Sequence, residues 1–279
     1  ELHAQAVAVF GAGAPNMRLR FRSSTNAEDL DALSGAGLYE SKSGCLADDM
    51  DGDDAGPSHC LSADDAAYYQ AQLDAARAEL AAHPDRVWLG ARIADYEGEL
   101  SDEKSAADAI RKAWASLWTL RAFEERAYWR IDHRAVYMGL AVNAAFTRER
   151  LDAVTVSALD GGGGLPVYRV VTQIAEVGVV QPDDPSAVPE TLVFRRGPGD
   201  EVLEPEVLVA SSFSENGGSL WSDAPQLETL GAVLYAIQDH FAREVYPDID
   251  RLSLDTEIKL THDDRIVVKQ VRVYTAAQP

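Results

Sequence analysis

The side chains most suited to chemistry gather in three segments, and the first is a strand-like run of alternating arginines. Residues 17–22 read MRLRFR, so every second side chain of an extended strand is a guanidinium. Arg18, Arg20 and Arg22 would project from one face, where they repel one another unless anions lie nearby. Guanidinium groups match phosphate oxygens with two parallel hydrogen bonds. The segment therefore predicts either a phosphate site or a strand whose arginines are neutralised by local Asp and Glu.

The second segment is a C-terminal hairpin that brings carboxylates, an amide and a guanidinium together. If the turn occupies residues 261–264, Asp255 faces Gln270 and Glu257 faces Val268. The side chains that then share one sheet face are Asp255, Glu257, Gln270, Arg272, Val268 and Ile266. Two carboxylates beside an amide suit Mg²⁺, which prefers oxygen ligands and completes its shell with water and phosphate. The alternative is a solvated polar face with one arginine–carboxylate pair.

The third segment is an amphipathic stretch, residues 105–130, in which Arg121, Arg126 and Arg130 alternate with glutamates. We expect one long helix here. Arg121 and Arg126 are five positions apart, about 140° around a helix, so one ligand contacts both only near an edge. A surface helix held by salt bridges is the alternative interpretation. We interpret the nearby His133 as an ordinary hydrogen-bonded histidine rather than a catalytic group.

The remaining chain supplies the elements that must position these segments. Helix-forming composition predicts helices over 64–83, 87–100 and 225–243, the first after a capping-box-like start at Ser62. Strand-like segments are residues 136–142, 153–156, 168–180, 252–260 and 265–274, and the four glycines 161–164 predict a hairpin connection. Helices mixed with antiparallel hairpins indicate an α+β architecture of mixed or antiparallel sheets flanked by helices.

Composition excludes several classes of function. The 279 residues carry 46 acidic and 25 basic side chains, a net charge of −21. Nucleic-acid affinity comes mainly from Lys and Arg that neutralise phosphates, so we expect no nucleic-acid partner. No apolar run approaches the roughly 18 residues of a spanning helix, and we expect no membrane span. GxSxG, HExxH, GxGxxG and Walker A motifs are absent from the sequence.

The two cysteines lie in an acidic loop-like stretch, and their state is open at this point. Cys45 and Cys60 are either free thiols or a local disulfide, and a disulfide would point to an oxidising compartment. A zinc site is disfavoured because no CxxC motif is present. The Asp48–Asp54 run allows a further alternative, a secreted Ca²⁺-binding module, although it lacks the glycine and the final glutamate of a calcium loop.

Three stretches resemble one known family. Residues 21–41, FRSSTNAEDLDALSGAGLYES, closely resemble the signature VRSSATNEDLPG-SGAGLYES of the N-terminal ATP-binding domain of pyruvate phosphate dikinase and phosphoenolpyruvate synthase. Residues 112–133, KAWASLWTLRAFEERAYWRIDH, are similar to its WASLF…RA…YR…IDH helix. The stretch LDTEIKL…RIVVKQVRVY, within residues 254–274, is similar to its closing DIEF…LYILQARP. Their order and spacing agree, so the resemblance covers most of the chain.

The resemblance implies an ATP-grasp fold, which holds ATP and Mg²⁺ between two α+β subdomains. Under it, residues 1–43 form the first strand and the RSS-motif loop of this domain. Residues 44–104 form an acidic, cysteine-containing helical insertion, and residues 105–279 form the remainder. The family has a further subdomain upstream of the RSS motif, where this chain has about 20 residues, so the resemblance indicates an incomplete N-terminus.

The resemblance also assigns roles to residues. Arg22 and Arg126 match the catalytic arginines that contact the nucleotide phosphates, and Arg121 matches a further nucleotide-binding arginine. Glu257 and Gln270 match the metal and nucleotide residues. Asp255 lies beside them as a further metal ligand, and Arg272 as a further nucleotide contact.

In the family this domain passes phosphoryl from ATP to a histidine on a swivelling domain, which hands it to pyruvate in a barrel domain. Those two domains would be partners elsewhere in a parent protein or on another chain. The alternative is a non-catalytic relative that senses nucleotide or binds protein, because the family's GLGE segment reads QIAE at residues 173–176. ATP use favours the cytoplasm, whereas a Cys45–Cys60 disulfide would favour an extracytoplasmic location.

Overall fold

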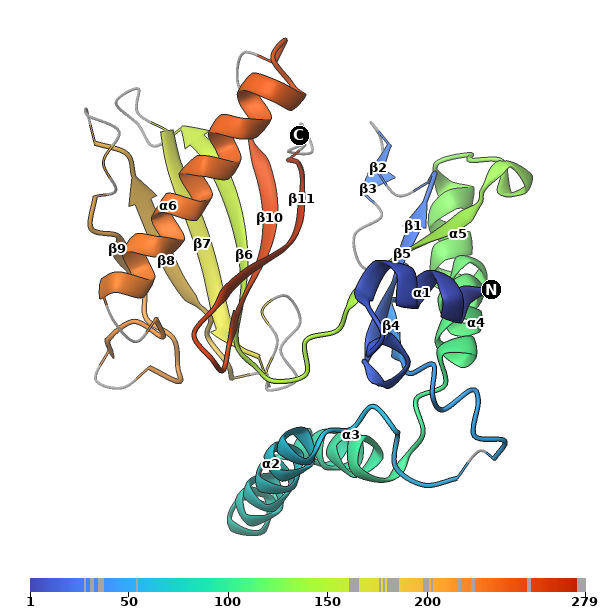
Figure 1. Ribbon diagram of the computed structural model, residues 1–279. Helices are drawn as coiled ribbons and strands as arrows, with labels where there is room; N and C mark the ends of the chain where they lie inside the picture. Colours follow the sequence, from blue (N-terminus) through green and yellow to red (C-terminus); the bar gives the residue numbers. More distant parts are fainter. Residues whose placement is uncertain are drawn as a thin grey trace. The chain divides into compact units, whose positions relative to one another are not determined.

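The computed structural model is a mixed α+β protein whose antiparallel sheets are flanked by helices (Figure 1). It describes residues 1–27, 29–30, 33–34, 38–53, 55–160, 166–175, 177, 179, 186–197, 201, 203–214, 217–221, 224–249 and 252–274. The chain divides into two compact units, unit 1 (Glu1–Thr147) and unit 2 (Arg148–Pro279). Among the described helices, none combines the length and apolar character that a bilayer crossing requires.

Unit 1 is built around a three-stranded antiparallel sheet in the order β4-β1-β5. Its strands are β1 (Leu19–Thr25), β4 (Lys42–Gly44) and β5 (Met138–Ala144), and a separate short pair is β2 (Asp29–Leu30) with β3 (Leu33–Ser34). Its principal helices are α1 (Leu2–Phe10), α2 (Ala63–Ala82), α3 (Leu89–Ser101), α4 (Ala106–Ala115) and α5 (Leu120–Tyr128). Short 3₁₀ turns occupy Ala14–Asn16, Ser116–Trp118 and His133–Ala135. Leu19 and Phe21 point into the core that α1 and α4 cover, which confirms the alternation predicted for the arginine strand.

Helices α2 and α3 confirm the two helices predicted from composition. Residues 44–104, which contain them, are called the insertion below, the name that the resemblance implies for this segment. The Ser62 hydroxyl caps α2 by accepting a hydrogen bond from the Asp65 amide at 3.1 Å. The single long helix expected over 105–130 is wrong, because the chain breaks into α4, a 3₁₀ turn and α5. Thr119 is the reason: its backbone is extended and its hydroxyl accepts from the Ala122 amide, so it starts a new helix.

A disulfide between Cys45 and Cys60 closes the acidic loop that precedes α2. The pairing selects one of the two states that the sequence left open, and it does not fix the compartment. The loop is fastened to the start of α4, because Asp48 accepts from the Lys104 amide at 2.8 Å and Asp49 accepts from the Ala107 amide. These two members of the Asp48–Asp54 run therefore have structural hydrogen bonds, while Asp54 lies outside the described residues.

Gly44, at the end of β4, allows the close approach of this loop to α4. A Cβ at this position would lie 2.6 Å from the backbone of Ala106, a distance that real Cβ atoms do not show. The main chain on either side is joined by hydrogen bonds between Cys45 and the 104–106 segment. Any side chain at residue 44 would therefore push α4 away from β4.

Unit 2 is a six-stranded antiparallel sheet in the order β11-β10-β6-β7-β8-β9. The strands are β6 (Glu149–Asp160), β7 (Pro166–Ile174), β8 (Glu190–Arg195), β9 (Glu206–Val209), β10 (Leu254–Thr261) and β11 (Ile266–Val273). Helix α6 (Ala224–His240), continued by a π-helical turn over Phe241–Val245, lies across one face of the sheet (Figure 1). β7 ends earlier than the predicted strand over 168–180. Glycines 161–164 lie outside the described residues, although the strands that they connect are paired antiparallel as expected.

The core of unit 2 lies between α6 and the sheet. Leu230, Leu234 and Tyr235 of the helix pack with Leu192 and Ile258 of the strands. Buried hydrogen bonds also connect α6 to the sheet. The Ser157 hydroxyl on β6 hydrogen-bonds the Gln238 side chain at 2.5 Å, and Gln238 donates to the Leu252 carbonyl at 2.8 Å. With this face buried, the opposite face of the sheet is left to carry half-buried polar side chains.

The C-terminal hairpin has a different register from the one predicted. Leu260 pairs with Ile266, and a bulge between Glu257 and Ile258 then shifts the pairing by a further residue. Glu257 therefore faces Gln270, whereas the sequence analysis placed Val268 there, which is wrong. A bulge inserts one residue on one strand, and no local sequence signal marked this one.

The predicted grouping of the hairpin's polar side chains nevertheless survives. Asp255 faces Arg272 and Glu257 faces Gln270, so all four share one face. Val268 and Ile266 face Ile258 and Leu260, so they lie on the opposite face of the sheet, where Ile266 packs against the core and Val268 is exposed. The expectation that these two residues cover the polar face is therefore wrong.

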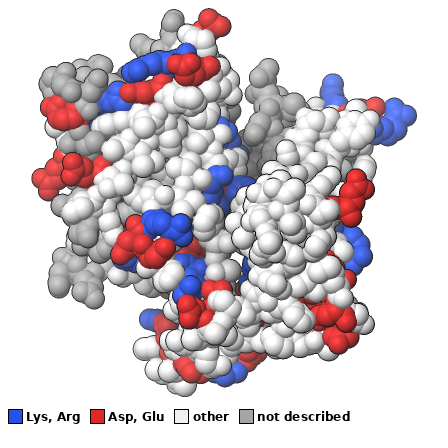
Figure 2. All heavy atoms as spheres, in the orientation of Figure 1, with Lys and Arg blue, Asp and Glu red and all other residues white. Residues whose placement is uncertain are grey.

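The acidic side chains are not spread evenly over the surface. On the face drawn in Figure 2, acidic and basic side chains form small separate clusters, and broad uncharged areas lie between them. Local charge can therefore differ from the net charge of −21, which acts over roughly a Debye length of 8–10 Å.

Candidate functional site

The polar face of the β10–β11 hairpin in unit 2 is organised by one ion pair. Arg272 Nε and Nη2 both donate to Asp255 Oδ2, at 2.8 and 2.7 Å. Asp255 Oδ1 is buried and accepts no hydrogen bond in the structure. A buried carboxylate oxygen without a partner is uncommon, because burial removes its hydrogen bonds to water and nothing in the protein replaces them. The ion pair thus holds a carboxylate in place with one oxygen available.

Glu257 and Gln270 lie next along the same face. They are directly opposite each other on neighbouring strands, and both side chains are half-buried. Facing side chains on antiparallel strands have Cβ atoms about 4.5–5.5 Å apart, within the span of one hydrated cation. Both residues have further polar contacts in the structure. The structure thus brings Asp255, Glu257, Gln270 and Arg272 together.

Lys259, two residues beyond Glu257 on β10, is a charged group that sequence reasoning missed. Its side chain is buried, with Nζ 2.5 Å from Glu149 and 2.8 Å from Asp152 on β6. Asp152 faces Lys259 directly across the two strands. A signal was present, since Lys259 follows Asp255 and Glu257 at period two and must share their face.

The arrangement on this face can hold a hard divalent cation. Oxygen atoms of Asp255, Glu257 and Gln270 offer the donor set that Mg²⁺ accepts, with water and a ligand's phosphates completing the shell. The buried Lys259 ammonium, already matched by two carboxylates, keeps the charge of the face from being wholly negative. These residues fit the predicted metal.

The arginines of β1, in unit 1, have three different environments. Arg18 is buried and paired with Glu99 of α3, Arg20 donates to the Ser43 hydroxyl at 3.2 Å, and Arg22 is half-buried opposite Ala141. The alternation could not predict the partner of Arg18, because Glu99 is 81 positions away in sequence. Arg18 thus has a carboxylate partner for one of its nitrogens, as one of the two alternatives for this strand expected.

Arg126 is fully buried in unit 1 and is bound by protein groups. Its Nη2 donates to the Leu117 carbonyl at 2.6 Å, Nε contacts His133 Nδ1 at 3.3 Å, and Nη1 reaches the Tyr39 hydroxyl at 3.4 Å. No carboxylate of the described residues pairs with it. His133 is thereby a hydrogen-bonded histidine, and its ring also stacks on Phe123.

The contact with Tyr39 joins two of the stretches that carry the family resemblance. The Glu40 amide also donates to the Ser116 hydroxyl at 3.0 Å, and Asn26 exchanges hydrogen bonds with the backbone of Ala135 and Tyr137. The stretch 21–41 therefore packs directly on the segments that begin and follow α5.

Arg121 does not share the environment of Arg126. It is exposed on α5, as its spacing from Arg126 predicted, and the structure does not bring the two guanidinium groups onto one side of the helix. Several large apolar side chains between residues 114 and 137 are also exposed: Trp114, Trp118, Leu120, Phe123, Tyr128, Trp129 and Tyr137. Exposed apolar patches are typical of interaction sites.

The two groups of unit 2 whose pKa is raised, Glu190 and Tyr235, lie in its core and not on the polar face. Burial raises the pKa of Glu190, and hydrogen bonds from Ser219 and the Leu220 amide offset this only in part. Burial likewise raises the pKa of Tyr235 to about 12, against the opposing charge of Arg196. Both groups support α6 and its flanking loop, so neither marks a proton-transfer site.

Comparisons in sequence do not assign the chain to a family. No protein-family model matches it, and neither does any curated protein. The family resemblance therefore remains a prediction, together with the ATP-grasp fold and the residue roles that it implies.

Proposed function

We propose that the chain is an ATP-grasp-like, ATP-binding domain of a phosphotransferase of the dikinase type. It would bind MgATP and position the γ-phosphate for transfer to a histidine on another domain or chain. The observation that carries the proposal is the facing pair Glu257–Gln270, with Asp255 Oδ1 available on the same face. Glu257 and Gln270, two of the residues to which the resemblance assigns metal and nucleotide roles, face each other on adjacent strands, although the register differs from the predicted one.

In the proposal, Asp255, Glu257 and Gln270 hold Mg²⁺, and Arg272 positions Asp255 and contributes to nucleotide binding. The resemblance assigns phosphate contacts to Arg22 and Arg126 and a nucleotide contact to Arg121, all three in unit 1, and the Arg22→Ala variant tests this part of the proposal separately from the unit 2 face. Catalysis of phosphoryl transfer is mainly positioning and charge neutralisation by arginines and Mg²⁺, so the domain needs no nucleophile of its own. Because Arg126 is buried in the structure, its role requires that a rearrangement of the surrounding residues expose its guanidinium.

Calorimetric titration of MgATP into the full chain tests the proposal. The unmutated chain should bind, and Glu257→Gln and Arg22→Ala should each weaken binding at least tenfold, about 1.4 kcal/mol. Glu206→Gln is the matched control, because Glu206 lies on β9 of the same sheet in an exposed pair with Arg195 and should bind as the unmutated chain does. Absence of binding by the unmutated chain, or full binding by Glu257→Gln, would refute the proposal.

A second candidate is a non-catalytic relative that senses nucleotide or binds protein. The exposed aromatic and aliphatic side chains around α5 favour it, because a partner that covered them would bury substantial apolar area. MgATP binding without phosphate release, and without transfer to a supplied histidine-bearing domain, would select this candidate. Transfer to such a domain would select the phosphotransferase.

A further inference from the structure

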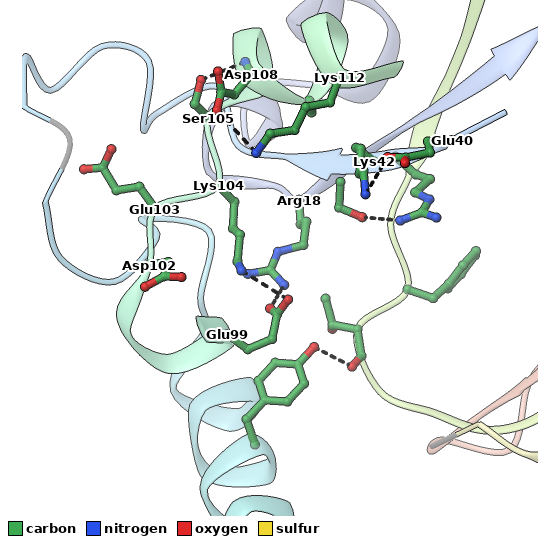
Figure 3. Close-up of a pocket in the computed structure, with 16 residues that line it drawn as sticks. Arg18, Glu40, Lys42, Glu99, Asp102, Glu103, Lys104, Ser105, Asp108 and Lys112 are labelled. Atoms are coloured by element: carbon green, nitrogen blue, oxygen red, sulfur yellow. Dashed lines mark hydrogen bonds and ion pairs between the residues drawn. The ribbon is translucent and has the colours of Figure 1, made fainter. Parts of the chain in front are cut away.

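A separate pocket lies wholly inside unit 1 and shares no residue with the proposed nucleotide site. It has a volume of about 750 Å³ and is formed by β1, β4, the end of α3 and the start of α4 (Figure 3). The predicted insertion supplies one wall, with Glu99 and Lys104, and the sheet supplies the other, with Arg18 and Arg20. The insertion therefore forms part of the wall of a cavity and also contributes the helices α2 and α3.

Cations are concentrated in this pocket. Its lining includes Arg18, Arg20, Lys42, Lys104 and Lys112. The whole chain has only five lysines, at positions 42, 104, 112, 259 and 269, so three of the five are here. These five cations balance the five acidic side chains that also line the pocket, so the cavity is close to neutral in a chain of net charge −21.

Arg18 provides the sharpest observation. Its side chain is only 6% exposed, and its Nη1 is bound to Glu99. Its Nε and Nη2 are excluded from water and have no hydrogen-bond partner in the structure. These two nitrogens form the edge of the guanidinium that binds two oxygens of one carboxylate or phosphate side by side. A buried charged donor without an acceptor is unfavourable, and an oxyanion ligand would supply the missing acceptors.

The carboxylates of the pocket set the size and charge of what can bind. Glu99 lies between Arg18 and Lys104, with Lys104 Nζ at 3.5 Å, and Figure 3 shows both cations pointing toward it. Lys42 lies 2.8 Å from Glu40. Five acidic side chains line the pocket beside the five cations, so a highly charged anion would meet repulsion there. A compact group with one or two negative charges fits best.

We propose that this pocket binds a small oxyanion group, a phosphate or a carboxylate, through the Nε–Nη2 edge of Arg18 with support from Arg20 and Lys42. The ligand is distinct from the proposed nucleotide, because the pocket does not include Arg22, Arg126 or any residue of the β10–β11 hairpin. The insertion would then serve to complete a second ligand site on the sheet.

Calorimetric titration of the full chain with inorganic phosphate and with succinate, at constant ionic strength, tests this proposal and distinguishes the two sources of the oxyanion. At least one ion should bind, and Lys42→Gln and Arg18→Gln should each weaken it at least tenfold. Arg77→Gln is the matched control, because this exposed arginine on α2 lies outside the pocket and should bind normally. Lys42 is partly exposed, so its variant remains informative even if Arg18→Gln fails to fold.

The proposal is overturned if neither ion binds the unmutated chain, or if Lys42→Gln binds as tightly as Arg77→Gln. Its outcome is separable from that of the nucleotide proposal, since Glu257→Gln should leave the affinity for the small oxyanion unchanged. Equal weakening by Glu257→Gln and Lys42→Gln would also contradict a second, independent site.

Discussion

Strand β1 of unit 1, with the residue before it, and strand β10 of unit 2 both present charged side chains at every second position. The two differ in which buried polar atoms lack a hydrogen-bond partner: donors in unit 1 and an acceptor in unit 2. Arg18, directly before β1, retains two buried donor nitrogens without acceptors. On β10, Asp255 retains a buried acceptor oxygen without a donor. The first strand therefore calls for an anion and the second for a cation. The difference shows that the same alternation of charged residues can produce sites for ligands of opposite charge on two sheets.

The two strands also differ in where their partners come from. Arg272, the partner of Asp255, is on the adjacent strand, 17 positions away. Glu99, the partner of Arg18, is in the insertion, 81 positions away. The polar face of unit 2 is thus formed by the sheet itself, whereas that of unit 1 depends on a segment that a disulfide holds in place.

The largest effect is expected at Arg126, a fully buried arginine of unit 1 with no carboxylate partner among the described residues. Arg126→Ala removes a fully buried side chain and leaves the Leu117 carbonyl without its donor. We expect a loss of about 4 kcal/mol in the free energy of unfolding of unit 1, measured by denaturant titration with hydrogen exchange resolved by region. Unit 2 should keep its protection. A stable variant that loses only MgATP binding would show that Arg126 is a ligand contact and not a structural group.

Removing the disulfide tests the dependence of unit 1 on the insertion. The Cys45→Ser/Cys60→Ser variant should lose about 3 kcal/mol, the value expected for a closed loop of 15 residues. The reason is that the open loop gains conformational freedom in the unfolded state. Unit 2 is an internal control, since the chain's two cysteines are both in unit 1. The contrast between the units fails if exchange in unit 2 rises as much as exchange in unit 1.

The ion pair on β10–β11 should contribute less. Arg272→Ala leaves Asp255 without its two hydrogen bonds, and we expect a loss of about 2 kcal/mol from unit 2 in thermal unfolding. Arg134→Ala, which removes an exposed pair with Asp132, is the matched comparison and should cost about 0.5 kcal/mol or less. Equal effects of the two variants would mean that burial does not strengthen the β10–β11 pair.

The smallest effect concerns pH. Because burial raises the pKa of Glu190 in the folded state, the folded chain binds its proton more tightly than the unfolded chain does. The stability of unit 2 should therefore fall as pH rises above the ordinary value of 4.5 toward the raised pKa. Glu190→Gln should abolish this fall and be at least as stable as the unmutated chain near pH 7. Urea titrations at several pH values would show it, and an unchanged slope in the variant would exclude Glu190 as the cause.

Local patterns predicted much of the fold. The cap at Ser62, the helices of the insertion and the strand alternation in residues 17–22 follow from side chains within one turn or one strand, so the sequence contains what decides them. The same holds for the polar face of the hairpin, since four side chains at period two keep their common side even when the register differs.

Features that depend on distant residues could not be predicted. The bulge at Glu257 arises while β10 also pairs with β6, and the break at Thr119 occurs where the chain turns over Ser116 and Leu117. The pocket in unit 1 needed Glu99 to meet Arg18, which no spacing in the sequence indicated. The arginine strand did indicate that anionic groups would lie nearby, because its three positive charges repel one another unless anions neutralise them.

The bulge in the hairpin has a consequence for how this chain should be aligned with any homologue. In a relative whose hairpin lacks the extra residue, an ungapped alignment anchored at the turn would match residues of opposite faces from Gln270 onward. The gap belongs opposite the bulge and not in the turn. Residue identities compared across the turn alone would therefore equate ligand-facing positions with core positions, and conservation scores for Gln270 and Arg272 would be misleading.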